Sequence, residues 1–88
     1  MSEFARFTEG QNVTLRIGSQ YDAVAIENTE DGEQLEIPVE IMQVNPTFEI
    51  VSIDYDRGFV YNLRLNGAVD EYDYIRVFGV DESDLLYF

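Results

Sequence analysis

The fold is indicated most clearly by the stretch Gln34–Ile41, which reads QLEIPVEI. Every second residue is apolar, and the residues between are Gln, Glu, Pro and Glu. Because successive side chains of a β-strand point to opposite faces, one face of this strand is predicted to be core and the other acidic. Pro38 has no backbone N–H to donate to a neighbouring strand, so this strand should lie at the edge of a sheet or contain a break.

Two further strands are predicted before this stretch. Residues 12–17 place Val13, Leu15 and Ile17 on one face. Residues 21–28 form a second, less regular strand that ends at the turn sequence NTEDG. Asn, Asp and Gly favour turns, so this strand and the QLEIPVEI strand are predicted to form a hairpin.

More strands are predicted after this stretch. The apolar positions of residues 47–55 change phase midway, as they do where a β-bulge bends a strand. Residues 59–65 alternate again, and Asn66 and Gly67 then give the strongest hairpin signal in the chain. The return strand is expected within residues 69–78.

The end of the chain is predicted to form one helical or tight turn over residues 81–88, capped by Asp81 or Ser83, with an apolar side chain against the core. Five to seven short strands joined by tight turns favour an all-β fold. The expected architecture is a small antiparallel, strongly bent β-barrel, with residues 1–88 as a single domain.

Core and turn residues recur with the spacings Phe7-x-x-Gly10-x-x-Val13, Phe48-x-Ile50-Val51-x-Ile53, Gly58 before Tyr61-x-Leu63, and Val80-Asp81-Glu82-Ser83-Asp84-Leu85. These spacings cover most of the chain and resemble those of SH3-like small β-barrel domains. An OB-like barrel is the second choice. The resemblance implies a fold and no particular activity, because none of these residues belongs to a functional motif.

The composition makes binding a better hypothesis than catalysis. The 88 residues include no His, Cys, Trp or Lys, which removes the usual general base, thiolate chemistry, Cys-based metal sites and Schiff-base chemistry. The acidic clusters at 70–73 and 81–84 could in principle supply an acid and a base, but a filled barrel leaves little room for a substrate cleft. Asp54 and Asp56 before Gly58 favour a turn over a calcium site. We therefore predict a non-enzymatic protein without a cofactor.

The net charge of −13 restricts the partners. Such a chain should repel nucleic acids and anionic membranes, and a basic protein is the favoured partner. The longest apolar runs are far shorter than the roughly 20 residues that span a bilayer, and no export signal is evident, so a cytoplasmic location is expected, in the host cytoplasm if the protein is viral. Arg57, Arg64 and Arg76 are expected to pair with nearby carboxylates. A homodimer through the edge at Pro38 is a further option.

The main functional hypothesis is an acidic inhibitor or regulator that mimics nucleic acid and covers a basic surface of a nucleic-acid-handling protein. Carboxylates are dense along the second and third strands and their turn, at Glu27, Glu30, Asp31, Glu33, Glu36 and Glu40. A second acidic segment carries tyrosines, which are common at the centres of interfaces. The predicted protein-binding residues are Glu36, Glu40, Asp70, Glu71, Tyr72, Asp73 and Tyr74.

The alternative hypothesis is a structural or accessory SH3-like module of a larger assembly, such as a virion. In that case the acidity would reflect a high-salt environment, as in halophilic adaptation, rather than a binding surface. Most of the tyrosines are expected in the core or half-buried in strands, and packing is also the alternative to an interface role for Tyr72 and Tyr74. The sequence leaves the identity of the partner, the source organism and the oligomeric state open.

Overall fold

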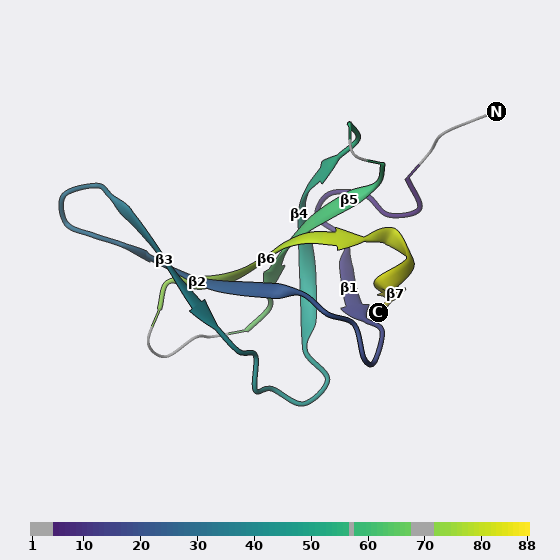
Figure 1. Ribbon diagram of the computed structural model, residues 1–88, viewed down its shortest axis with the longest axis horizontal. Helices are drawn as coiled ribbons and strands as arrows, with labels where there is room; N and C mark the ends of the chain where they lie inside the picture. The colour runs from purple at the N-terminus through teal and green to yellow at the C-terminus, as the bar shows by residue number, and fades with distance from the viewer. Residues whose placement is uncertain (1–4, 57, 68–71) are drawn as a thin grey trace.

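The computed structural model describes residues 5–56, 58–67 and 72–88. The protein is all-β, as predicted, and these described residues form seven strands, within the expected five to seven (Figure 1). The strands are β1 (Asn12–Leu15), β2 (Asp22–Asn28), β3 (Gln34–Val39), β4 (Thr47–Asp54), β5 (Val60–Leu65), β6 (Tyr74–Asp81) and β7 (Leu85–Tyr87), and the short 3-10 helix η1 (Glu82–Asp84) lies between β6 and β7. None of the described segments forms a helix long and apolar enough to cross a membrane.

All strands join one antiparallel sheet in the order β3-β2-β6-β5-β4-β1-β7. The order has two ends, β3 and β7, and no pairing between them is found among the described residues. The sheet is therefore open in its hydrogen bonding, and closure into a barrel stays a prediction. One face of the sheet carries the core, which also receives Phe7 from the segment before β1.

The predicted phase change in the fourth strand is a β-bulge. The register of β4 against β5 shifts between Ile50 and Ser52. Before the shift Phe48 and Ile50 are buried, the extra residue Val51 is 37% exposed, and after the shift Ile53 packs against the core. The extra residue thus re-aims the side chains of the strand, as the sequence indicated.

The edge position predicted from Pro38 is confirmed, because β3 is an outer strand and, among the described residues, pairs with β2 alone. Two predictions about burial are wrong. Leu35 was expected in the core but is 44% exposed, and Ile17 was expected on the core face of the first strand but is fully exposed. Leu35 pairs with Glu27, one residue past the last pair between β2 and β6, so it lies on the two-stranded end of the hairpin. Strand β1 ends at Leu15, so Ile17 lies outside it.

The predicted C-terminal turn is η1, which leads into β7 and buries Leu85. Asp81 occupies the N-cap position as expected, but its side chain makes no capping hydrogen bond. The turn is held instead by Glu82. Its Oε2 accepts a hydrogen bond from the Tyr61 hydroxyl at 2.6 Å and one from the Arg6 backbone N–H at 3.0 Å.

Candidate functional site

The hairpin of β2 and β3 extends past the rest of the sheet. Strand β6 pairs with β2 only from Asp22 to Ile26, whereas β3 continues to pair with β2 as far as Asn28. The hairpin therefore continues as a two-stranded ribbon, which projects to the left in Figure 1. We call the segment Glu27–Glu36 the acidic ribbon.

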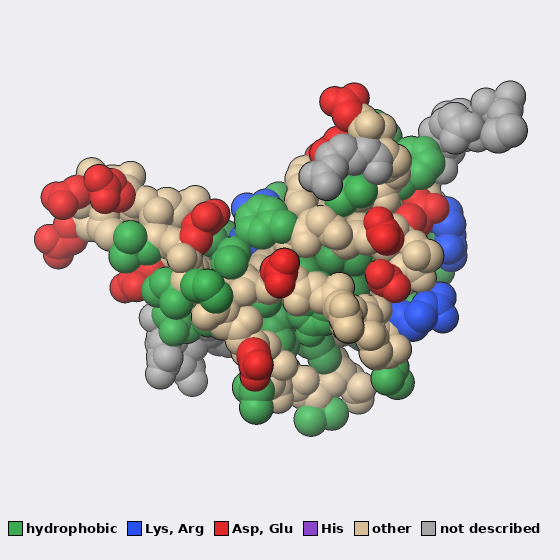
Figure 2. Space-filling model, in the orientation of Figure 1, with side chains coloured by type: hydrophobic (Ala, Val, Ile, Leu, Met, Phe, Trp, Pro, Cys, Tyr) green, Lys and Arg blue, Asp and Glu red, His purple; other side chains and the backbone are tan. Residues whose placement is uncertain are grey.

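The acidic ribbon has five carboxylates among its ten residues, and all five residues are exposed. The sequence contains no basic residue between Arg16 and Arg57, so none lies on the ribbon itself. Figure 2 shows these acidic side chains gathered over the end of the hairpin. The five are Glu27, Glu30, Asp31, Glu33 and Glu36.

The tip of the ribbon is a tight three-residue turn. The Thr29 N–H donates to the Glu33 carbonyl at 2.8 Å, and the Gly32 N–H donates to the Thr29 carbonyl at 3.1 Å. Gly32 has φ of 85°, a left-handed conformation that completes such hairpin loops and that side chains rarely adopt. The turn holds Glu30 and Asp31 at the outermost point of the hairpin.

The base of the ribbon is anchored by the start of β6. Asp73 Oδ2 accepts hydrogen bonds from the Asn28 backbone N–H at 2.8 Å and from Asn28 Nδ2 at 3.0 Å. The Asp73 N–H also donates to the Ile26 carbonyl at 3.0 Å, and Gln34 Nε2 donates to the Tyr74 hydroxyl at 3.2 Å. A two-stranded ribbon is marginally stable alone, so these bonds help to fix its direction.

The predicted binding residues fall into three groups. Glu36 and Glu40 are exposed on or just after β3. Asp73 and Tyr74 lie at the base of the ribbon, where they anchor it as described above. Tyr72 is half-buried and packs against the core.

The remaining two predicted binding residues, Asp70 and Glu71, lie outside the described residues. Among the others, the sheet brings Glu36 and Tyr74 to one face, because both are register partners of Ile26. Their proposed role in binding stays a prediction. The anchoring role of Asp73 had no signal in the sequence, since Asn28 is 45 residues away.

Among the described residues, two of the arginines expected to pair with carboxylates stack on aromatic rings. The Arg64 guanidinium lies 4.9 Å from the centre of the Tyr74 ring, and that of Arg76 lies 4.9 Å from the centre of the Phe78 ring. Both distances are within the range of cation–π attraction. Arg57 lies outside the described residues.

The other acidic motifs have local roles in the structure. Asp54 Oδ1 accepts a hydrogen bond from the Asp56 N–H at 3.0 Å, which is the turn predicted for this sequence. Glu82 is occupied by Tyr61 and by the backbone of Arg6. In the part of the chain that the structure describes, no group of three or more carboxylates is placed to hold a metal ion.

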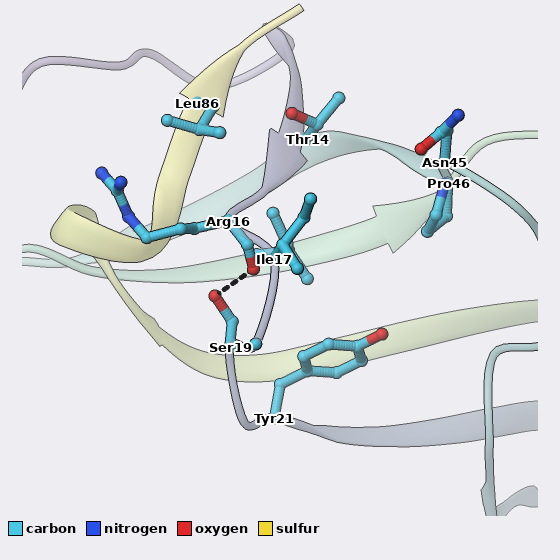
Figure 3. Close-up of a pocket in the computed structure, with 10 residues that line it drawn as sticks. Thr14, Arg16, Ile17, Ser19, Tyr21, Asn45, Pro46 and Leu86 are labelled. Atoms are coloured by element: carbon cyan, nitrogen blue, oxygen red, sulfur yellow. Dashed lines mark hydrogen bonds between the residues drawn. The ribbon is translucent and has the colours of Figure 1, made fainter.

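A hollow of about 520 Å³ lies at the other end of the molecule, and sequence reasoning did not identify it. Its wall includes Thr14, Ile17, Tyr21, Pro46 and Leu86, from β1, the turn after it, the segment before β4, and β7 (Figure 3). None of the described residues that line it is acidic. The hollow forms from segments that are far apart in the sequence, so no local pattern could reveal it.

Comparison with protein-family models, with curated proteins and with solved structures finds no match to this chain. The function is therefore argued from the residues and their arrangement. The feature with the most distinct chemistry is the acidic ribbon, because it concentrates one sign of charge on an element that projects from the sheet.

Proposed function

We propose that this protein is a non-enzymatic inhibitor that places its acidic ribbon on a basic, nucleic-acid-binding surface of a partner protein. The observation that carries the proposal is the ribbon, in which five exposed carboxylates project from the sheet. A nucleic acid would be excluded from the same partner by the volume of the ribbon and by its charge.

The charge pattern of the ribbon supports this competition. Glu30, Asp31 and Glu33 lie in the turn at the tip, and Glu27 and Glu36 lie on the two strands next to it, so the negative charge is concentrated at the end of the ribbon. Lys and Arg side chains of the partner would meet carboxylates in place of phosphates. Such an interface associates rapidly through electrostatic steering and weakens as salt is added.

The anchoring of the ribbon supports its use as a binding element. Asp73 and Tyr74 fix the base of the hairpin through Asn28 and Gln34 before any partner arrives. A preorganised element loses less conformational entropy on binding than a mobile loop, so more of the electrostatic attraction appears as affinity.

The proposal is tested with the tagged protein as bait in a lysate of the native host. We expect at least one nucleic-acid-binding protein to be retained at physiological salt, and to be released both by rising salt and by added duplex DNA. Neutralising the ribbon with Glu30→Gln, Asp31→Asn and Glu33→Gln should abolish retention.

The matched control removes three charges elsewhere, with Glu9→Gln, Asp56→Asn and Asp81→Asn, all at exposed positions. This variant should retain the partner. Equal loss of retention in both variants would contradict the site. Retained proteins that DNA does not displace would contradict nucleic-acid mimicry and favour an accessory module of a larger assembly.

A further inference from the structure

Two arginines lie directly opposite each other on neighbouring strands. Arg64 of β5 and Arg76 of β6 are register partners, so their side chains leave the same face of the sheet. This is the outer face, because Leu63 and Val77, which precede and follow them, are buried in the core. Like charges directly opposite each other destabilise a sheet, and here they meet in a chain whose net charge is −13.

The two guanidinium groups are held by aromatic rings on either side. Arg64 lies over Tyr74 and Arg76 over Phe78, each 4.9 Å from the ring centre. Stacking uses the face of a guanidinium plane and leaves its edge, which carries the N–H donors, free for other partners. The Nε of Arg76 is buried and has no hydrogen-bond partner among the described residues.

On this face of the sheet, the residues of β2 next to the two arginines are apolar. Val24 of β2 is the next register partner of Arg76, and Ile26, the register partner of Tyr74, is only 1% exposed. Phe78 is 40% exposed beside them. The site therefore combines two arginines on neighbouring strands with aromatic and aliphatic side chains beside them.

We propose that the Arg64–Arg76 pair is a docking site for a single carboxylate that a partner protein carries next to an apolar group. A carboxylate can accept parallel hydrogen bonds from guanidinium edges, and it would neutralise the opposed charges. The apolar group beside it would contact Phe78. This site lies outside the acidic ribbon and does not depend on the function proposed for the ribbon.

The surrounding charge favours a carboxylate over a phosphate or a polyanion. The molecule carries −13 overall, and Glu49 of β4 is the other register partner of Arg64. Repulsion grows with each negative charge on the ligand, so a group of charge −1 is favoured over a dianion. The exposed ring of Phe78 also matches a protein side chain or chain terminus better than a free inorganic ion.

The test follows the Nε–Hε NMR signals of the arginines during three titrations, with N-acetyl-leucine, N-acetyl-leucinamide and inorganic phosphate. N-acetyl-leucine, which has one carboxylate next to an isobutyl group, should shift the signals of Arg64 and Arg76 saturably. The amide, which differs by the loss of the charge, should leave them unchanged. Phosphate should bind more weakly than N-acetyl-leucine.

Single substitutions test the contribution of each arginine to binding. R64Q or R76Q should weaken the association by about tenfold or more, as expected for the loss of a charged hydrogen bond. R64K and R76K keep the charge and the aliphatic stem, so they should fold normally yet also bind more weakly, since Lys cannot form the bidentate contact. R6Q is the matched control, because Arg6 also lies over aromatic rings but has no arginine as its register partner.

Three results would overturn the proposal. The first is an absence of saturable shifts at Arg64 and Arg76, or equal shifts at Arg6. The second is an equal response to the amide, which would leave the carboxylate without a role. The third is tighter binding of phosphate than of N-acetyl-leucine, which would assign the site to a phosphate group instead.

Discussion

At the scale of single residues, Tyr61 connects the core to the C-terminal turn. Its side chain is completely buried, and its hydroxyl donates to Glu82 at 2.6 Å. Burial raises the pKa of Tyr61 above its usual value, and the hydrogen bond to the Glu82 carboxylate raises it further. The folded protein therefore holds this proton more tightly than the unfolded chain does.

This raised pKa predicts a loss of stability in alkali. The contribution of Tyr61 is fully present below the pKa of an unfolded tyrosine, about 10, and is lost as the pH rises above that value. The free energy of unfolding, measured with urea between neutral and strongly alkaline pH, should therefore fall more steeply above about pH 10 in the native protein than in Tyr61→Phe.

At neutral pH, Tyr61→Phe should itself lower the free energy of unfolding by about 1.5 to 3 kcal/mol, the range for a hydrogen bond to a charged group. Tyr55→Phe is the control, because Tyr55 is 63% exposed. It should change neither the stability nor its pH dependence. Identical alkaline slopes in the native protein and in Tyr61→Phe would show that Tyr61 does not govern this transition.

At the scale of the strand, Pro38 protects an open edge of the sheet. It lies opposite Val24 in β3, the outermost strand of the sheet that the described residues form. Proline is accepted in an edge strand where its missing N–H would face solvent, so Pro38 interrupts the row of donors that another chain could use.

Replacing Pro38 with Val should therefore promote self-association through β3. Sedimentation velocity should show concentration-dependent dimers or larger species for Pro38→Val, more at high salt, because salt screens the repulsion between two acidic chains. Pro46→Val changes the other proline, which precedes β4, and should leave the native behaviour unchanged. A Pro38→Val protein that behaves as the native one at every salt concentration would show that Pro38 is not what protects the edge.

The strands could be predicted because alternation is local, whereas burial is not. The pattern in Gln34–Ile41 identified an edge strand, and the phase change in residues 47–55 identified the bulge. Alternation states which side of a strand a residue occupies, but not whether another element covers that side. The prediction that Leu35 is buried was therefore wrong, because the pairing of β6 with β2 stops at Ile26. The same prediction for Ile17 was wrong because β1 ends at Leu15.

The residue types of the candidate site could be predicted from the sequence, but their arrangement in space could not. The density of carboxylates around Glu36 was visible in the sequence, and their exposure follows from their charge. The projection of the ribbon was not visible, because it depends on where β6 stops pairing with β2. The stacking of Arg64 on Tyr74 also depends on the register of two strands, which alternation alone does not fix.

At the scale of the whole molecule, the distribution of charge sets two opposite responses to salt. The ribbon gathers five carboxylates, and the folded protein keeps them close together without an intervening basic residue. Their mutual repulsion acts against the folded state, so screening should stabilise the fold. Screening also weakens attraction to a basic partner, so salt should favour folding and oppose binding.

Thermal melts across ionic strength test the first response. The native Tm should rise from low salt to about 0.5 M, where the Debye length has fallen to several ångströms. Glu30→Gln, Asp31→Asn and Glu33→Gln together reduce the net charge from −13 to −10, since −13 plus 3 is −10, as do Glu9→Gln, Asp56→Asn and Asp81→Asn. The ribbon variant should show the smaller rise, because its three charges lie within one turn, whereas those of the control are scattered.

If the rise of Tm with salt is reduced equally in the two variants, the net charge, and not its concentration on the ribbon, governs stability. A native Tm that does not respond to salt would mean that the folded protein accommodates the five carboxylates without measurable strain. With the expected result, the ribbon is an element kept at a cost to stability. Such a cost is what we expect of a surface whose charges are retained for a partner and not for the fold.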